Sequence, residues 1–70
     1  MAIEVKLQGD EIVVTRLGTD FMAAYQKRFD SPNLMLTRSW VDPASPAVSE
    51  FRAHAFRAAV SKARELGWIV

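Results

Sequence analysis

The 70-residue chain contains no cysteine, which excludes a disulfide framework, a thiolate nucleophile and a zinc–thiolate site. It has a single histidine, and its three glycines, Gly9, Gly18 and Gly67, stand apart from one another, so there is no glycine-rich phosphate loop. These absences leave no specific catalytic, metal or nucleotide motif. We therefore expect a protein that is not an enzyme and that carries no cofactor.

Neither sign of charge dominates, and no long apolar run occurs. Nine Lys and Arg residues against eight Asp and Glu residues give a formal net charge of +1, which is too balanced to demand an acidic partner. No apolar run approaches the ~18 residues of a membrane span, and the charged start of the chain is unlike a signal peptide. We expect a cytoplasmic, bacterial-type soluble domain with no membrane partner.

Half of the residues are hydrophobic, which is a large share for so short a chain. Disorder is not expected at this hydrophobicity. The chain (1–70) should form one domain, near the size at which core burial barely offsets the entropy of the chain. Small domains without disulfides often gain stability by oligomerising, so the composition favours self-association.

The stretch 45–66 predicts one long helix, around which the rest of the chain is organised. Ser45 is a suitable N-cap, and Pro46 suits the first helical position because its missing N–H costs nothing there. No Gly or Pro interrupts the following residues, and Gly67 is placed to end the helix in a left-handed conformation.

The apolar arc of this helix is wider than one buried face needs. At about 100° per residue, a central stripe runs through Val48, Phe51, Ala55, Ala59, Ala63 and Leu66. Ala53, Phe56 and Val60 widen the arc on one flank and Ala58 widens it on the other, to roughly twice the usual 100°, with interruptions at Arg52 and Lys62. We interpret this as one face on a sheet and a second face against something else. The alternative is that loops of the same chain cover the extra arc.

Alternating apolar and polar residues before the helix predict a small sheet. Residues 3–8 have the period-two pattern of a half-buried strand, and Gly9-Asp10 suits a two-residue hairpin loop. With this loop, Val5 lies opposite Val14 in a second strand.

The segment 21–29 admits two interpretations. Its composition is helical, but as a strand it would pair Ala23 with Val14 and Tyr25 with Ile12, which extends the same apolar face. An isolated two-stranded hairpin is marginal in water, and one helix needs a wider sheet to lie on. We therefore prefer the strand, although the sequence alone leaves both open.

Residues 34–40 alternate again, with Leu36 and Trp40 assigned to the inner face. The predicted fold is α+β: a four-stranded antiparallel β-meander followed by one long C-terminal helix packed on one sheet face (ββββα). The outer face would be more apolar than a solvated face should be, because it carries Val13, Leu17, Met22, Ala24 and Met35.

Exposed apolar groups that gather in one patch usually mark an interaction surface. We therefore predict a small interaction or regulatory domain that acts as a homodimer. The predicted self-association residues are Phe56, Val60 and Ala53 on the helix flank and Met22 and Met35 on the outer sheet face.

A single-stranded nucleic-acid-binding module is the alternative function. Lys27, Arg28 and Arg38 lie near the predicted third hairpin, interleaved with aromatic residues, and single-strand binders combine basic and aromatic side chains in this way. A ββββα unit that dimerises also resembles single-stranded-DNA-binding coactivator domains, by fold analogy alone. The balanced net charge and the predicted burial of Tyr25 and Trp40 weigh against this function.

Glu50, His54 and Ser61 share one helix face and formally supply a carboxylate, an imidazole and a hydroxyl. Seven residues along a helix span roughly 10 Å, so His54 cannot contact Ser61. We interpret His54 as a solvated residue beside Glu50, and a metal site formed by these two at a symmetric interface as the less favoured alternative.

Two segments of the chain resemble a family of very short uncharacterised bacterial proteins. They are residues 18–27 (GTDFMAAYQK) and residues 62–70 (KARELGWIV). The resemblance covers about a third of the chain. It implies no activity, cofactor or functional residue.

Overall fold

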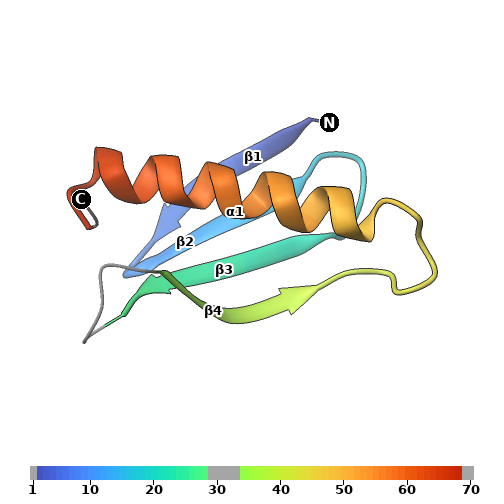
Figure 1. Cartoon of the computed structure of the whole chain (residues 1–70), viewed down its shortest axis with the longest axis horizontal. Coiled ribbons are helices and arrows are strands. Elements are labelled where there is room, and N and C mark those ends of the chain that lie inside the picture. The colour runs from blue at the N-terminus through green and yellow to red at the C-terminus, as the bar shows by residue number, and fades with distance from the viewer. Residues whose placement is uncertain (1, 29–33, 69–70) are drawn as a thin grey trace.

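The structure is a computed structural model, and it describes residues 2–28 and 34–68. One antiparallel sheet has the strand order β1-β2-β3-β4, and a single helix, α1, lies across one face of it (Figure 1). The elements are β1 (Ile3–Gln8), β2 (Glu11–Arg16), β3 (Met22–Lys27), β4 (Leu34–Trp40) and α1 (Val48–Glu65). The predicted ββββα fold is confirmed.

The strand pairing follows from the tight loops. Val5 lies opposite Val14 across β1 and β2, and Gly9 adopts a φ of 61° in the two-residue loop between these strands. On the other side of β2, Val14 lies opposite Ala23, and Ile12 lies opposite Tyr25, so the segment after the second turn is the preferred strand. The end of that predicted segment, residue 29, lies outside the described residues.

The core lies between α1 and the central strands. The largest fully buried side chains are Ile12, Val14 and Phe51. The rest of the buried helix face consists of Ala55, Ala59 and Ala63, each with no exposed surface. Because alanine side chains are short, the helix backbone lies close to the sheet at these positions.

The helix begins later than the sequence predicts. Its first residue is Val48, its N-cap is Ala47, and no side chain caps it. The Ser45 hydroxyl instead accepts a hydrogen bond from the backbone N–H of Ala47 at 3.2 Å. This two-residue reach closes a separate turn around Pro46, and the helix starts only after that turn.

The C-terminal end of the helix is formed as predicted. Gly67 has a φ of 78°, its N–H donates to the carbonyl of Arg64, and the N–H of Trp68 donates to the carbonyl of Ala63. These two bonds are the Schellman pair, which satisfies carbonyls that the helix itself leaves without partners. Trp68 also packs against the core.

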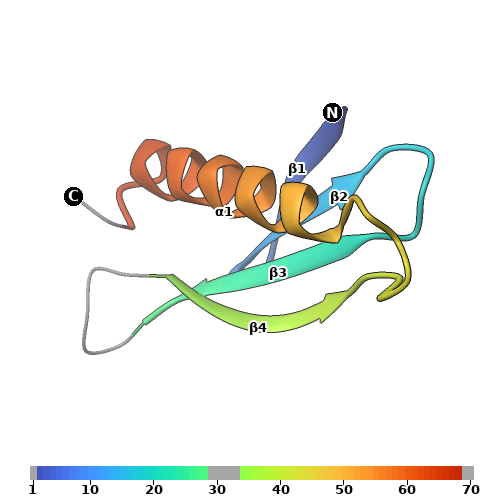
Figure 2. The ribbon, with the colours of Figure 1, turned by 45° about the vertical axis from the view of Figure 1, so that its right-hand side comes forward.

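One irregularity in β4 changes which residues face the helix. Tyr25 lies opposite Leu36, but Ala24 lies opposite Arg38, so Thr37 is an extra residue in a β-bulge. β4 bends visibly along its length (Figure 2). Before the bulge the even-numbered residues face the helix, and after it the odd-numbered ones do.

Trp40 is therefore not on the predicted face. It lies opposite Met22, on the side of the sheet away from the helix, and is 52% exposed, while its ring meets that of Phe21 edge-on at 6.3 Å. Ser39 and Val41 take the inner positions instead. The prediction for Trp40 was wrong because strict alternation does not allow for an inserted residue.

The helix end yields a stability prediction. Replacing Gly67 by Ala should lower the free energy of unfolding by about 1–2 kcal/mol, because a side chain with a Cβ is strained at positive φ. Among the described residues, no atom other than those of the chain neighbours lies within 4 Å of the added Cβ, so the cost is conformational and not steric. Urea denaturation measures this difference in the free energy of unfolding. Gly67→Asn, which tolerates this conformation better, is the matched control, and equal stability of all three proteins would contradict the assignment.

Candidate functional site

The single helix does not cover the whole sheet. α1 packs mainly on β2 and to a smaller extent on β1 and β3, and β4 lies outside this main footprint. A helix with its side chains is about 10–12 Å wide, whereas four strands at about 4.8 Å spacing span roughly 14 Å between the outer strands alone. The inward-facing side of β4 is therefore left open beside the helix.

This open strip is an apolar groove of about 280 Å³, which we call the α1–β4 groove. Its main lining residues are Tyr25 on β3, Leu34 and Leu36 on β4, Val41 after β4, and Arg52 and Phe56 on α1. Phe56 on one wall is 50% exposed, and Leu36 on the other is 53% exposed. Two large apolar side chains thus stand half in solvent on facing walls.

Tyr25 links the two walls of the groove. Its ring meets the ring of Phe56 edge-on, with 6.2 Å between the ring centroids, and only 6% of the residue is exposed. Burial raises the pKa of the Tyr25 phenol above its ordinary value, because the charged phenolate loses hydration there.

The predicted self-association residues lie on two opposite faces of the molecule. Phe56 is in the groove, and Val60, one turn further along α1, lines a shallow depression that continues from it. Ala53 is exposed on the same helix. Met22 and Met35 are on the outer face of the sheet, opposite Trp40 and Gln26, respectively. The structure therefore brings the three helix residues together but not the two methionines with them.

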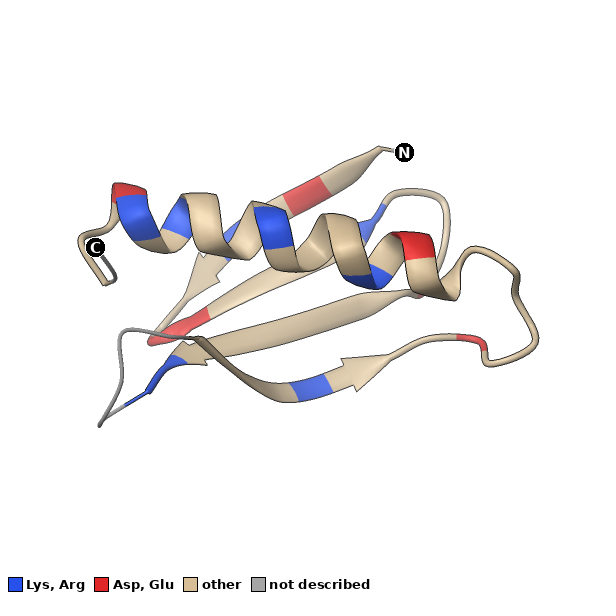
Figure 3. Cartoon of the chain, in the orientation of Figure 1, with Lys and Arg blue, Asp and Glu red and all other residues tan. Residues whose placement is uncertain are grey.

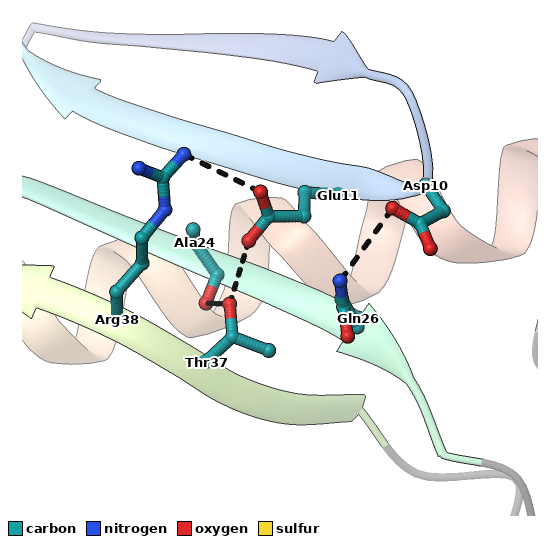
Figure 4. Close-up of polar contacts among 6 residues, drawn as sticks. All are labelled: Asp10, Glu11, Ala24, Gln26, Thr37 and Arg38. Carbon is teal, nitrogen blue, oxygen red and sulfur yellow. Dashed lines mark hydrogen bonds and ion pairs between the residues drawn. The ribbon is translucent and has the colours of Figure 1, made fainter.

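Polar side chains cover part of the outer face of the sheet. Arg38 on β4 reaches across β3 to Glu11 on β2, with 3.3 Å between the charged groups (Figure 4). The Thr37 hydroxyl lies 2.8 Å from the Glu11 carboxylate and 3.1 Å from the carbonyl of Ala24, both of which are acceptors. Ala24 beneath them is fully buried, and Val13 beside it is 8% exposed.

The contacts among Glu11, Thr37 and Arg38 reduce the apolar surface that the outer face exposes. Two of its apolar residues, Val13 and Ala24, are already shielded and offer little surface to a partner. Met35 remains 44% exposed, and Trp40, which the bulge adds to this face, is 52% exposed. The outer face is thus a less continuous apolar surface than the sequence predicts.

The predicted nucleic-acid residues lie at the end of β3 and on β4. Arg38 is paired with Glu11, and Lys27 is exposed at the end of β3, next to Arg28. Tyr25, one of the interleaved aromatics, is buried, and residue 29 lies outside the described residues. Lys and Arg residues are spread over both the helix and the sheet (Figure 3).

Catalytic and metal-binding arrangements gain no support from the geometry. Glu50 and Ser61 are exposed and His54 is half-buried on α1, and within 2–28 and 34–68 no side-chain hydrogen bond or ion pair joins any two of them. Over the same residues, no group of three or more His, Asp or Glu side chains could hold a metal ion. The described part of the chain contains no helix long and apolar enough to cross a membrane.

No protein-family model, curated protein or solved structure gives a match to this chain. The function is therefore inferred from the arrangement of the chain's own residues.

The sequence pointed to Phe56 but missed the groove beside it. Leu36 was placed on the inner face, where we expected the helix to cover it, and the sequence pattern did not place Arg52 in a groove. The signal that could have revealed the groove is the width of the sheet, since one helix cannot cover four strands.

The paired state of Arg38 yields a prediction for nucleic-acid binding. Fluorescence anisotropy of a labelled single-stranded oligonucleotide should not change on addition of the protein, even at low salt, because Arg38 is paired with Glu11 and the net charge of the chain is only +1. Glu11→Gln frees this guanidinium and is the matched comparison. A large, salt-sensitive increase with the unaltered protein would instead support the nucleic-acid function.

Tyr25 is the only tyrosine, so its ionisation can be followed by phenolate absorbance without interference from others. The folded protein should titrate at a higher pH than the protein in urea. The raised pKa means that the tyrosine contribution to stability is complete below about pH 10 and is lost as the pH rises through the folded-state pKa. The urea midpoint should therefore fall more steeply with pH in this range than that of Tyr25→Phe. Identical titrations in the folded and unfolded states would contradict the burial.

Proposed function

We propose that this protein is a non-enzymatic interaction domain that acts as a homodimer, and that the α1–β4 groove is its binding surface. The observation that carries the proposal is the uncovered inner side of β4 beside a helix whose flank is also apolar. Leu36 and Phe56 are both half-exposed on the walls of one groove, whereas singly scattered apolar residues would need no explanation.

Burial of Leu36 and Phe56 alone does not hold two copies together. Full burial of a Leu or Phe side chain is worth about 1.5–3 kcal/mol, so covering the exposed halves of Leu36 and Phe56 contributes roughly 1 kcal/mol each. Two copies bring about 4 kcal/mol from these residues, which is near the lower limit of the cost of association. Leu34, Val41 and Val60 must contribute as well.

A regulatory role and a location in the bacterial cytoplasm remain part of the proposal as expectations from the sequence. Single-stranded nucleic-acid binding is the less supported alternative, because Arg38 already has an anionic partner and Tyr25 faces the groove.

The proposal predicts the effect of a charge in the groove. Light scattering over a tenfold concentration range should show the mass of the unaltered protein rising from 7.9 kDa toward twice that value. Phe56→Glu should remain a folded monomer throughout, because a carboxylate buried between two copies loses its hydration. Circular dichroism checks that the variant is folded.

Met35→Glu is the matched control, since Met35 is also half-exposed but lies on the outer face of the sheet. It should dimerise like the unaltered protein. Loss of the dimer in Met35→Glu and its retention in Phe56→Glu would move the interface to the outer face. An unaltered protein that is monomeric at every concentration would refute the homodimer.

A further inference from the structure

We propose that the α1–β4 groove binds a small carboxylate with an unbranched apolar chain, of the size of octanoate, with the carboxylate at Arg52 and the chain between Leu36 and Phe56. This inference rests on the proposed function in using the same groove, and it adds a small-molecule ligand. The groove volume of about 280 Å³ lies near the lower end of the range for small-molecule sites. At about 30 Å³ for each small group, the share of one water in the liquid, the groove holds roughly nine non-hydrogen atoms.

The polar groups of the groove suit an anion. Among the described residues that line it, Arg52 carries the charge, Tyr25 and Ser39 carry hydroxyls, and none is acidic. A guanidinium has only hydrogen-bond donors, and a hydroxyl can donate as well as accept. All three side chains can therefore donate to a carboxylate, whereas a cationic ligand would meet a like charge and no carboxylate of the groove.

These three side chains have no other partner in the described structure. Within 2–28 and 34–68, no hydrogen bond or ion pair engages the side chain of Arg52, Ser39 or Tyr25. The same residues include no fully buried side-chain oxygen without a partner, so the Tyr25 hydroxyl reaches solvent although only 6% of the residue is exposed. Nearly buried polar groups usually have a hydrogen-bond partner. The Tyr25 hydroxyl is thus a donor that a ligand in the groove can use.

Both walls of the groove change from polar to apolar in the same direction. β4 ends on the side of the molecule where α1 begins, so the two walls run in opposite directions (Figure 1). On α1, Phe56 comes one turn after Arg52, and on β4, Leu36 comes three residues before Ser39. Phe56 and Leu36 both lie next to Tyr25, Phe56 by its ring contact and Leu36 as the strand partner. The groove therefore has a polar end and an apolar end, which matches a carboxylate with an apolar chain.

The ligand and a second copy would cover the same exposed side chains, Leu36 and Phe56. Ligand binding and dimerisation through the groove therefore exclude each other. Octanoate should lower the mass measured by light scattering toward 7.9 kDa. A ligand that opens the dimer in this way would supply the regulatory role that the sequence leads us to expect.

An NMR titration of the ¹⁵N-labelled protein, at a concentration low enough for it to be monomeric, measures the affinity and locates the ligand. Octanoate should bind about fivefold more tightly than octylamine, which has the same chain and the opposite charge. Hexanoate should bind about four- to sixteenfold more weakly than octanoate, because each CH₂ that is half or fully buried contributes a factor of about two to four. The amide signals of Leu36 and Phe56 should shift more than that of Met35, which lies on the outer face.

Arg52→Gln should abolish the preference for octanoate over octylamine, because the amide carries no charge. Lys62→Gln is the matched control, since it also removes one positive charge from α1. Lys62 lines a separate depression beside Val5, on the other flank of the helix. This control should keep the preference. Circular dichroism checks that both variants are folded, which we expect because neither position belongs to the buried core.

Equal affinity for octanoate and octylamine, an Arg52→Gln variant that keeps the preference, or larger shifts at Met35 than at Leu36 would each overturn the site. A titration without saturable shifts would overturn it too. Light scattering without ligand separates this inference from the proposed function. A protein that binds octanoate and is monomeric at every concentration would support the site and refute the homodimer, whereas a dimer that does not bind octanoate would do the opposite. Bound octanoate with an unchanged dimer mass would support the site and move the dimer interface away from the groove.

Discussion

The contact between one alanine-faced helix and the middle of the sheet is the constraint on which the rest of the structure depends. Ala55, Ala59 and Ala63 are fully buried and short, so α1 lies close against the sheet, mainly over β2. Only Phe51 inserts a large side chain from the helix into the fully buried core. A helix held this tightly over β2 cannot also shift sideways to cover β4.

The exposed apolar surface follows from that position. Both flanks of α1 stand beside the sheet, but the β4 flank carries Phe56 and Val60, over which none of the described strands lies. On the outer face, by contrast, the Glu11–Arg38 pair and the Thr37 hydroxyl shield Ala24. Apolar residues on the two faces of the sheet are therefore in different situations, although their sequence pattern is similar.

Much of the fold could be predicted from the sequence because the turn residues and the pairing of apolar residues across the strands indicate the same register. The two-residue loop at Gly9-Asp10 fixes the register of the first hairpin, and continuation of the same apolar face then decides in favour of a strand at Tyr25. The start of α1 could not be located from composition, because the Ser45 hydroxyl can bond either a helical N–H or the N–H of Ala47 in a preceding turn. The groove was missed for a different reason: it arises from the relative widths of a helix and a sheet, which no local pattern records.

The β-bulge in β4 affects both the shape of the groove and the edge of the sheet. With unbroken alternation, Trp40 would point toward the helix and its large ring would fill the far end of the groove. The extra residue, Thr37, turns Trp40 to the outer face and puts the small side chain of Ser39 in the groove lining. The same residue interrupts β4 where a neighbouring strand would have to pair with it. One inserted residue thus leaves the inner side of β4 open and makes its edge unsuited to pairing with a further strand. Together these two effects favour a partner that approaches the groove from the helix side.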